Sequence, residues 1–276
     1  MHVFSQPIKP PALTNDSIRV AVRLWCEDPA QATAKYGRIE DWDTSEVTVM
    51  QGLFQEQTYF NDNISGWDMS KVTDMSHMFW DTIIFNQDIS GWDVSSVMNM
   101  SELFCEATSF NQDISGWDVS SVTNMSHMFC DTKNFNQDIS GWDVSSVIYM
   151  SEMFFCATSF NQDLSRWDVS NVTNMDSMFR GATSFNQDLS GWNVSRVISM
   201  CRLFEDATSF NQDLSGWNVS RVTNMCFMFH NAASFNQDLS EWDVSSVQVF
   251  HDMFRATILA ATLQRTMHVS SFFEGV

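Results

Sequence analysis

Apolar and polar positions recur along this chain in blocks of 25 residues, without insertion or deletion. Tryptophan starts each block, at positions 42, 67, 92, 117, 142, 167, 192, 217 and 242. Apolar side chains then follow 5, 8, 12, 18 and 22 residues later, as at Val122, Met125, Phe129, Phe135 and Ile139. One block offers about eight core residues, too few to offset the entropy of ordering it alone. The pattern therefore predicts units that stack and share one continuous core.

Each unit is expected to combine strands with a turn of helix. The runs Phe110 to Ser115 and Val122 to Met125 are typical of short strands. The 3 and 4 spacing of Met125, Met128 and Phe129 predicts a helical turn. The expected fold class is a repeat solenoid, mainly β with short helical turns, in which strands pair between neighbouring coils.

The repeat divides the chain into four segments. Apolar residues from Ile18 to Trp25 follow a helical stripe behind the capping candidate Thr14, which predicts a helix from about residue 15 to 27. Such a helix covers apolar surface that an open stack exposes. The expected organisation is a flexible leader over 1–14, an N-terminal helical cap over 15–41, repeats over 42–254, and a C-terminal cap or tail over 255–276.

Charge and hydropathy narrow the possible partners. The chain has 276 residues with 34 acidic and 14 basic side chains, a net charge of -20. Nucleic acid is not an expected partner, because phosphate binding rests on clustered Lys and Arg. Membrane insertion is not expected either, because no apolar run reaches roughly 18 residues. Residues 1–14 show no apolar core of a secretory signal peptide.

A longer motif carries a family resemblance. The run F-N-Q-D-[IL]-S-x-W-[DN]-V-S-x-V-x-x-M-x-x-[ML]-F, seen from Phe110 to Phe129, and the leader segments 18–25 and 36–45 resemble BspA-type leucine-rich repeat surface proteins. This family is also known as a mycoplasma-type domain of unknown function. The resemblance covers about residues 17 to 254 and implies a right-handed, leucine-rich-repeat-like coil. It also implies a cell-surface or secreted setting with binding or adhesion roles, and no catalytic residues.

Two acidic columns run along the repeat. Asp follows Trp in seven units, whereas Asn193 and Asn218 take its place in two; a second column begins at Asn63 and continues from Asp88 to Asp238. Asn shares the acceptor oxygen of Asp but not its charge. Both columns are therefore expected to accept hydrogen bonds from turn backbone. A ladder of calcium sites is the alternative.

Four cysteines form two pairs that are 25 residues apart. Cys105 and Cys130 share one phase of the repeat, and Cys201 and Cys226 share another. Adjacent coils would bring each pair within the Cα distance of a disulfide. Stacked side chains point the same way, so reduced packing thiols are favoured and disulfides are the alternative.

The position ten residues after Trp varies most clearly. It holds His77, Glu102, His127, Glu152, Ser177, Arg202, Phe227 and Asp252. A column that varies within a repeated framework is expected to face solvent and to line a surface for a partner. The alternative is a surface that merely tolerates change.

Basic residues gather in the later units. Arg196 and Arg221 share one phase in adjacent coils, and Arg202 and Phe227 lie on the variable column. These residues predict a patch for an anionic partner on an acidic protein. Drift in a tolerated surface is the alternative.

The expected function is non-enzymatic binding or adhesion, with a repeated surface presented to a protein or glycan partner. No catalytic residue, cofactor or metal site is predicted, because the carboxylates belong to every unit and single out no coil. The alternative is a solenoid hydrolase or lyase that acts on acidic polysaccharide. An irregular coil with a cleft would favour the enzyme, and uniform coils favour binding.

Overall fold

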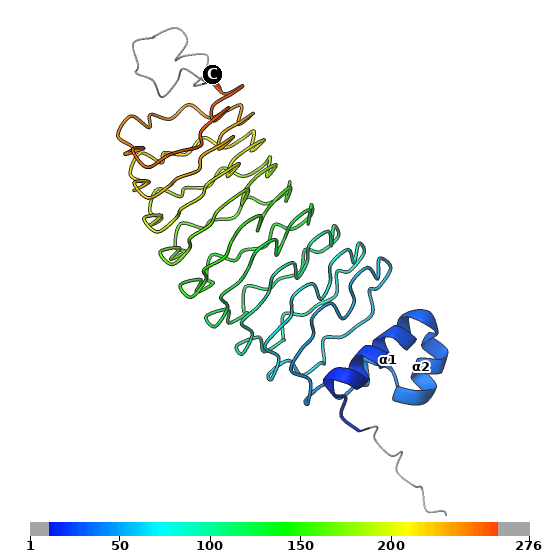
Figure 1. Cartoon of the computed structure of the whole chain (residues 1–276). Helices are drawn as coiled ribbons and strands as arrows, with labels where there is room; N and C mark the ends of the chain where they lie inside the picture. Colours follow the sequence, from blue (N-terminus) through cyan, green and yellow to red (C-terminus); the bar gives the residue numbers. More distant parts are fainter. Residues whose placement is uncertain (1–10, 259–276) are drawn as a thin grey trace, which may run out of the picture.

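The computed structural model describes residues 11–258, which begin with helices and continue as a stack of coils. Helix α1 spans Asn15–Glu27, helix α2 spans Pro29–Tyr36, and the 3-10 turn η1 spans Ile39–Asp41. From Trp42 onward, 25-residue coils stack along one axis into an elongated rod (Figure 1). Most of the expected leader over 1–14 and of the expected cap or tail over 255–276 lies outside the described residues.

Helix α1 begins at a capping box and coincides with the expected capping helix. The side chain of Thr14 accepts a hydrogen bond from the Ser17 N–H, and the Ser17 hydroxyl accepts one from the Thr14 N–H. Its buried residues Ile18, Ala21 and Val22 belong to the same core as the coils. The helix therefore closes the N-terminal end of that core.

Side chains of α1 also form hydrogen bonds with backbone groups of the first coil, which has no preceding coil to pair with. Asn15 Oδ1 accepts hydrogen bonds from the N–H groups of Thr48 and Val49 at 2.8 and 3.2 Å. Arg19 Nη1 donates to the carbonyl of Gln51 at 2.7 Å. In later units the equivalent backbone groups pair with the preceding coil. The helix thus satisfies an edge that would otherwise be open for pairing with another chain.

Neighbouring coils are joined by what we call the turn ladder, residues 8 to 14 after each tryptophan. In the unit that starts at Trp92, alternate N–H groups donate to carbonyls of the next coil: Met100 to Asn124 (3.0 Å), Glu102 to Ser126 (2.9 Å), Phe104 to Met128 (3.0 Å) and Glu106 to Cys130 (2.7 Å). The intervening N–H groups of Leu103 and Cys105 close turns within their own coil, and that of Ser101 donates to Asn99 Oδ1. Every N–H from Met100 to Glu106 is satisfied in this way.

The expected mainly β, leucine-rich-repeat-like solenoid is wrong. Over residues 11–258 the structure contains no β-strand, and single bridges join adjacent coils, such as Asn99 with Asn124. The segments 110–115 and 122–125, expected as strands, are irregular or turns apart from one bridge residue. The helical turn expected from Met125 to Phe129 is a series of tight turns.

Left-handed backbone at two positions of each ladder is the physical reason why the ladder forms neither a strand nor a helical turn. Residues 10 and 14 after tryptophan have positive φ, 56° at Glu102 and 61° at Glu106 for example. This conformation interrupts both an extended strand and a right-handed helix. It costs an L-residue about 1–2 kcal/mol. The N–H groups of these same residues donate to the next coil, which offsets that cost.

The core consists of columns of identical aromatic residues. Phe104 stacks on Phe129 of the next coil with ring centroids 5.9 Å apart, and on Phe110 of its own unit at 3.8 Å. Each repeat tryptophan is buried, and from Trp92 onward its indole N–H donates to a carbonyl of the preceding coil, as from Trp117 to Ile89 at 3.2 Å. Every unit therefore packs mainly on its own copies.

We predict that Glu106→Gly stabilises the protein. Glu106 is exposed, has positive φ, and its side chain makes no hydrogen bond or ion pair within residues 11–258. Glycine adopts the left-handed conformation without strain, so urea unfolding should show a gain of up to about 1 kcal/mol. Ser121→Gly is the matched control, at an exposed residue whose φ is not positive. The control should lose roughly 0.5–1 kcal/mol, and equal effects of the two substitutions would contradict the assignment of strain.

Candidate functional site

The turn ladder sorts its side chains into an inner and an outer set. Residues 8, 11, 12 and 15 after each tryptophan are inner; Met100, Leu103, Phe104 and Ala107 are all 0% exposed. Residues 9, 10, 13 and 14 form the outer set, and most of them are partly or fully exposed. We call this outer set the variable face.

The variable face changes from unit to unit while the rest of the coil repeats. Residue 18 after tryptophan is Phe throughout, from Phe60 to Phe235. Residue 13, by contrast, is successively Gln55, Trp80, Cys105, Cys130, Phe155, Arg180, Glu205, His230 and Arg255. Sequence reasoning identified only position 10 of this face. The variation at position 13, together with the changes at positions 9 and 14 in the later units, was the signal that it missed.

The first four predicted residues at position 10 lie on this face as two pairs. Nε2 of His77 is 3.2 Å from Oε1 of Glu102, and Nε2 of His127 is 3.3 Å from Oε1 of Glu152. The hydrogen bond to Glu152 raises the pKa of His127, and the same bond lowers the pKa of Glu152. Imidazole and carboxylate thus lie in contact from one coil to the next. Within residues 11–258, no three His, Cys, Asp or Glu side chains are grouped as a metal site requires.

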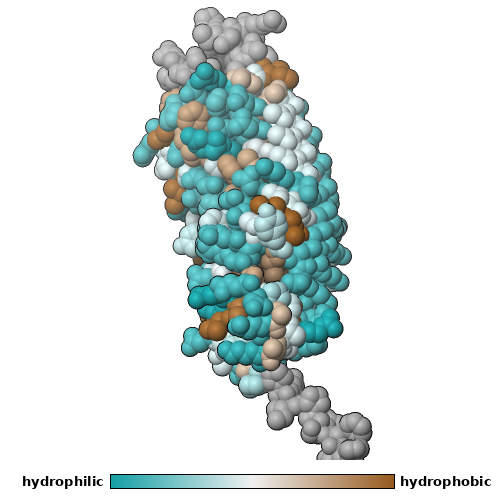
Figure 2. Space-filling model, turned by 90° about the vertical axis from the view of Figure 1, so that its right-hand side faces the viewer, coloured by the Kyte–Doolittle hydropathy of each residue, from teal (hydrophilic) through white to brown (hydrophobic). Residues whose placement is uncertain are grey.

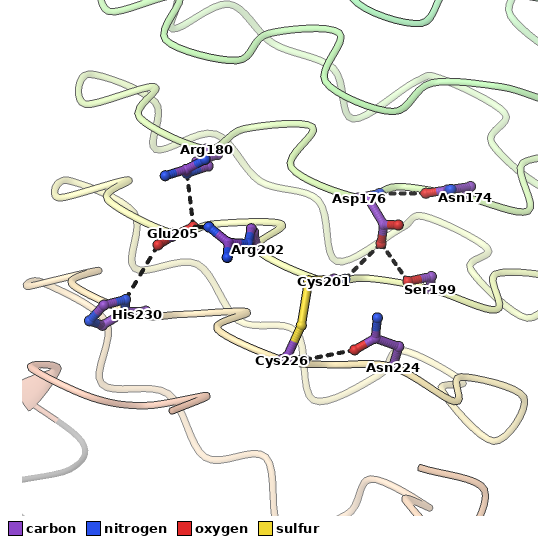
Figure 3. Close-up of a disulfide and its surroundings, with 10 residues drawn as sticks. All are labelled: Asn174, Asp176, Arg180, Ser199, Cys201, Arg202, Glu205, Asn224, Cys226 and His230. Carbon is purple, nitrogen blue, oxygen red and sulfur yellow. Dashed lines mark hydrogen bonds and ion pairs between the residues drawn. A yellow bond between two sulfur atoms is a disulfide. The ribbon is translucent and has the colours of Figure 1, made fainter. Parts of the chain in front are cut away.

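Arg202 and Phe227 belong to a charged cluster around Glu205. Glu205 is only 5% exposed, and its carboxylate lies 2.8 Å from Arg180 Nε, 3.2 Å from Arg202 Nη1 and 3.4 Å from His230 Nδ1 (Figure 3). The Arg202 guanidinium also lies over the Phe227 ring, 4.8 Å from its centroid. Three coils therefore contribute bases to one buried acid.

The structure does not bring the four residues of the predicted basic patch together. Arg196 and Arg221 occupy position 4 after tryptophan, outside the variable face. Arg196 Nη1 donates to Asn171 Oδ1 at 2.7 Å, in the equivalent position one coil earlier. Arg202, in contrast, is engaged by Glu205. The predicted residues therefore have different partners, and two of them lie at a position outside the variable face.

Two adjoining depressions hollow the N-terminal end of the variable face. They measure about 480 and 270 Å³, and both are lined by Arg19 of α1 together with Gly52 and Gln55. His77, Trp80 and Glu102 line the larger one. Gly52 is the residue at position 10 of the first unit, where every later unit carries a side chain. The hollow therefore arises where the column lacks a side chain.

The two cysteine pairs differ from each other. Cys201 and Cys226 form a disulfide, with Cα atoms 4.8 Å apart (Figure 3), so the expectation of reduced thiols is wrong for this pair. Cys105 and Cys130 are buried free thiols, as expected. A hydrogen bond between their side chains, together with burial, raises the pKa of Cys130.

The acidic columns accept hydrogen bonds within turns, as the sequence predicts. Asp118 Oδ1 accepts from the Ser120 N–H at 3.1 Å and from its hydroxyl at 2.6 Å. Asn218 makes the same two contacts with Ser220. The hydrogen bonds from Ser120 lower the pKa of Asp118. The columns therefore organise turns throughout the rod and distinguish no single site.

Comparison with known protein families shows the family to which the repeat belongs. Three overlapping stretches, residues 29–123, 112–200 and 166–268, match the family model described as Mycoplasma protein of unknown function, DUF285. The chain belongs to this family. This confirms the mycoplasma-type domain of unknown function that the repeat resembles. No curated protein and no solved structure matches the chain.

The part of this DUF285 protein that matches the family contains the coils that carry the variable face. The match begins at Pro29, the first residue of α2, so α1 and its Arg19 lie outside it. None of the helices among residues 11–258 is both long and apolar enough to cross a membrane. The description of the family names no activity. A function is therefore argued from the geometry of the variable face.

We predict that the acidic columns make the protein sensitive to acid. Hydrogen bonds from serine lower the folded-state pKa of Asp68, Asp118 and Asp168 below the ordinary value of 3.8. Their contribution is therefore complete above that value and is lost as pH falls through the lowered folded-state pKa. The triple variant Asp68→Asn, Asp118→Asn, Asp168→Asn should melt within about 2 °C of the wild type at pH 7, as surface changes usually do. Below about pH 4 it should lose less stability than the wild type, which urea unfolding against pH measures.

We also predict that reduction weakens the C-terminal coils. The Cys201–Cys226 disulfide closes a loop with a sequence separation of 25. Its reduction should lower the free energy of unfolding by about 3 kcal/mol, by the chain-entropy estimate. The double variant Cys201→Ser, Cys226→Ser should not respond to reductant. Alkylation of denatured, unreduced protein should label Cys105 and Cys130 and spare the disulfide pair; labelling of Cys201 would contradict the pairing.

Proposed function

We propose that this protein is a non-enzymatic binding protein of the adhesion type, which presents the variable face to a protein or glycan partner. The observation that carries the proposal is the restriction of side-chain variety to one face. Core columns and turn-forming Asp, Ser and Asn residues repeat from unit to unit, whereas the outer residues of the ladder change. A framework that repeats around a face that varies is how repeat proteins display different contacts on one scaffold.

Rigid backbone supports a binding role for this face. In a central unit each of the seven ladder N–H groups is hydrogen-bonded, and four of these bonds cross to the next coil. Side chains presented on such a backbone lose little further conformational entropy when a partner binds. The face also carries aromatic and Arg side chains, including Trp80, Phe155, Arg180, Arg202 and Phe227, the residue types enriched at binding hot spots.

The polarity of the surface suits contacts with a partner through polar groups and single aromatic residues. The side of the rod seen in Figure 2 is largely hydrophilic, and its hydrophobic residues form separate spots. Some carboxylates of the variable face are paired with bases, as Glu152 is with His127 and Glu205 with Arg180, whereas Glu106 has no such partner among the described residues. The pairing of Glu152 and Glu205 favours binding over acid-base chemistry by these two groups, because glycoside hydrolysis needs carboxyl groups free to exchange a proton with substrate.

A cell-surface or secreted setting completes the proposal. The finer part of the resemblance, to BspA-type leucine-rich repeat surface proteins, implies such a setting and a role in adhesion. The Cys201–Cys226 disulfide supports it, because disulfides persist in oxidising compartments and are rare in reducing ones.

The test compares two sets of variants after a protein and glycan array screen of the purified chain. The face variant Phe155→Ser, Arg202→Ser, Phe227→Ser should bind the partner from the screen at least about tenfold more weakly. The control variant Arg196→Ser, Arg221→Ser changes basic residues outside the face and should bind like the wild type. Melting temperatures verify that both variants fold. Loss of binding in the control with normal binding by the face variant would contradict the proposal and place the contact at the Arg196 and Arg221 column.

A further inference from the structure

The first unit differs from the later ones at position 10 of the variable face, where it has Gly52 in place of a residue with a larger side chain. Gly52 has a φ of 59°, like the non-glycine residues at position 10 of the later coils. A Cβ atom at Gly52 would lie 3.0 Å from the side-chain oxygen of Gln55, a close contact, so a side chain at this position requires the end of Gln55 to shift. The larger depression lies here, between α1 and the first coils.

An unusual tryptophan lines this depression. The nine repeat tryptophans are at most 8% exposed, and their indole N–H groups bond to carbonyls. Trp80 stands outside that series, at position 13 of its unit, and is partly exposed. Its indole N–H has no hydrogen-bond partner within residues 11–258. Trp80 therefore offers both an apolar ring and a free donor at the edge of the hollow.

The other residues that line the larger depression include two amide side chains and two groups of opposite charge, Arg19 and Glu102. Gln51 and Gln55 each provide an amide that both donates and accepts. The Arg19 guanidinium donates to the Gln51 carbonyl, and the Glu102 carboxylate is paired with His77. One positive and one negative group thus balance each other within the depression.

Polar atoms beside the depression also lack partners. Ser76 is 1% exposed, and neither its hydroxyl nor His77 Nδ1 has a hydrogen bond within the described chain. In the next unit the equivalent hydroxyl of Ser101 donates to Asn99 Oδ1 at 2.9 Å. Buried polar groups without partners are uncommon in stable proteins. Hydrogen bonding in this part of the face is therefore incomplete, in contrast to the next coil.

We infer that the depression at Gly52 binds a neutral saccharide. The inference rests on the proposed binding role of the variable face and names the ligand class of its N-terminal end. Sugar hydroxyls donate and accept hydrogen bonds, which amides and a carboxylate match. The C–H face of a pyranose packs on the negative face of an indole ring. A polyanion is disfavoured by the net charge of -20, and the acidic Glu27 and Glu102 offset the basic Arg19 and Arg23 that line the two depressions.

The dimensions fit more than one sugar unit. The larger depression, about 480 Å³, lies within the roughly 300–1,000 Å³ of small-molecule sites. The smaller one adjoins it and shares Arg19, Gly52 and Gln55. An oligosaccharide that lies across both would pass directly over Gly52. A side chain at that position would block it.

The experiment titrates the full chain with defined oligosaccharides by ligand-observed NMR. The neutral probes are maltotriose, cellotriose and triacetylchitotriose, and the anionic probe is trigalacturonate. We expect at least one neutral probe to bind. Trp80→Ala should weaken binding about tenfold or more, and Trp80→Phe should retain most of it, because one aromatic contact is lost in the first variant and kept in the second.

Gly52→His tests the geometry by filling the hollow. Histidine stands at the same left-handed position in His77 and His127, so the ladder accommodates it. This variant should abolish saccharide binding without a large change in melting temperature. Tyr149→Ala is the matched control, an exposed aromatic residue outside the variable face, and should bind like the wild type.

Two results would overturn the inference: no binding of any neutral probe, or equal binding by the wild type, Trp80→Ala and Gly52→His. Preference for trigalacturonate would also overturn it. Failure here is distinguishable from failure of the proposed function. A partner that the Phe155→Ser, Arg202→Ser, Phe227→Ser variant loses and Gly52→His retains would support the variable face while rejecting its saccharide site.

Discussion

The hydrogen bonds that left-handed residues donate from one coil to the next determine the form of this protein. At positions 10 and 14 of each unit, a backbone conformation that L-residues rarely adopt directs the N–H toward a carbonyl 24 residues ahead. Turns close between these bonds, so coils pair without becoming strands. A single unit has no neighbour to receive such bonds, and the strained conformation is therefore stable only in the stack.

The same alternation creates the variable face. Two inward residues follow two outward ones along the ladder, a period that neither a strand nor a helix produces. The inward pairs supply Met, Leu and Phe to the core, whereas the outward pairs are free to differ. Some charged residues on the face are paired across coils, as Glu205 shows with bases from three coils. The face can thus vary in chemistry while the backbone beneath it stays the same.

The N-terminal end shows what happens where the stack stops. Asn15 and Arg19 of α1 bond to the backbone groups that a preceding coil would have paired. This cap leaves Arg19 beside Gly52 and Trp80, so the edge of the rod is also the place where the face is hollowed. Closing the stack and shaping a pocket are consequences of the same helix.

The sequence by itself determined the 25-residue period, the aromatic core columns, the capping helix α1 and the hydrogen-bonding role of the acidic columns. These features follow from burial and local turn chemistry, which the pattern of residues records directly. Asn218, for example, stands where other units have Asp and accepts the same hydrogen bond from a serine N–H. The tertiary structure alone decided that Glu102 and Glu106 are left-handed, since neither is glycine and the partner carbonyls lie in the next coil. It also gave Arg196 and Arg202 different partners and joined Cys201 to Cys226. A pattern of apolar positions records which side chains are buried, but not which distant backbone group each N–H will meet.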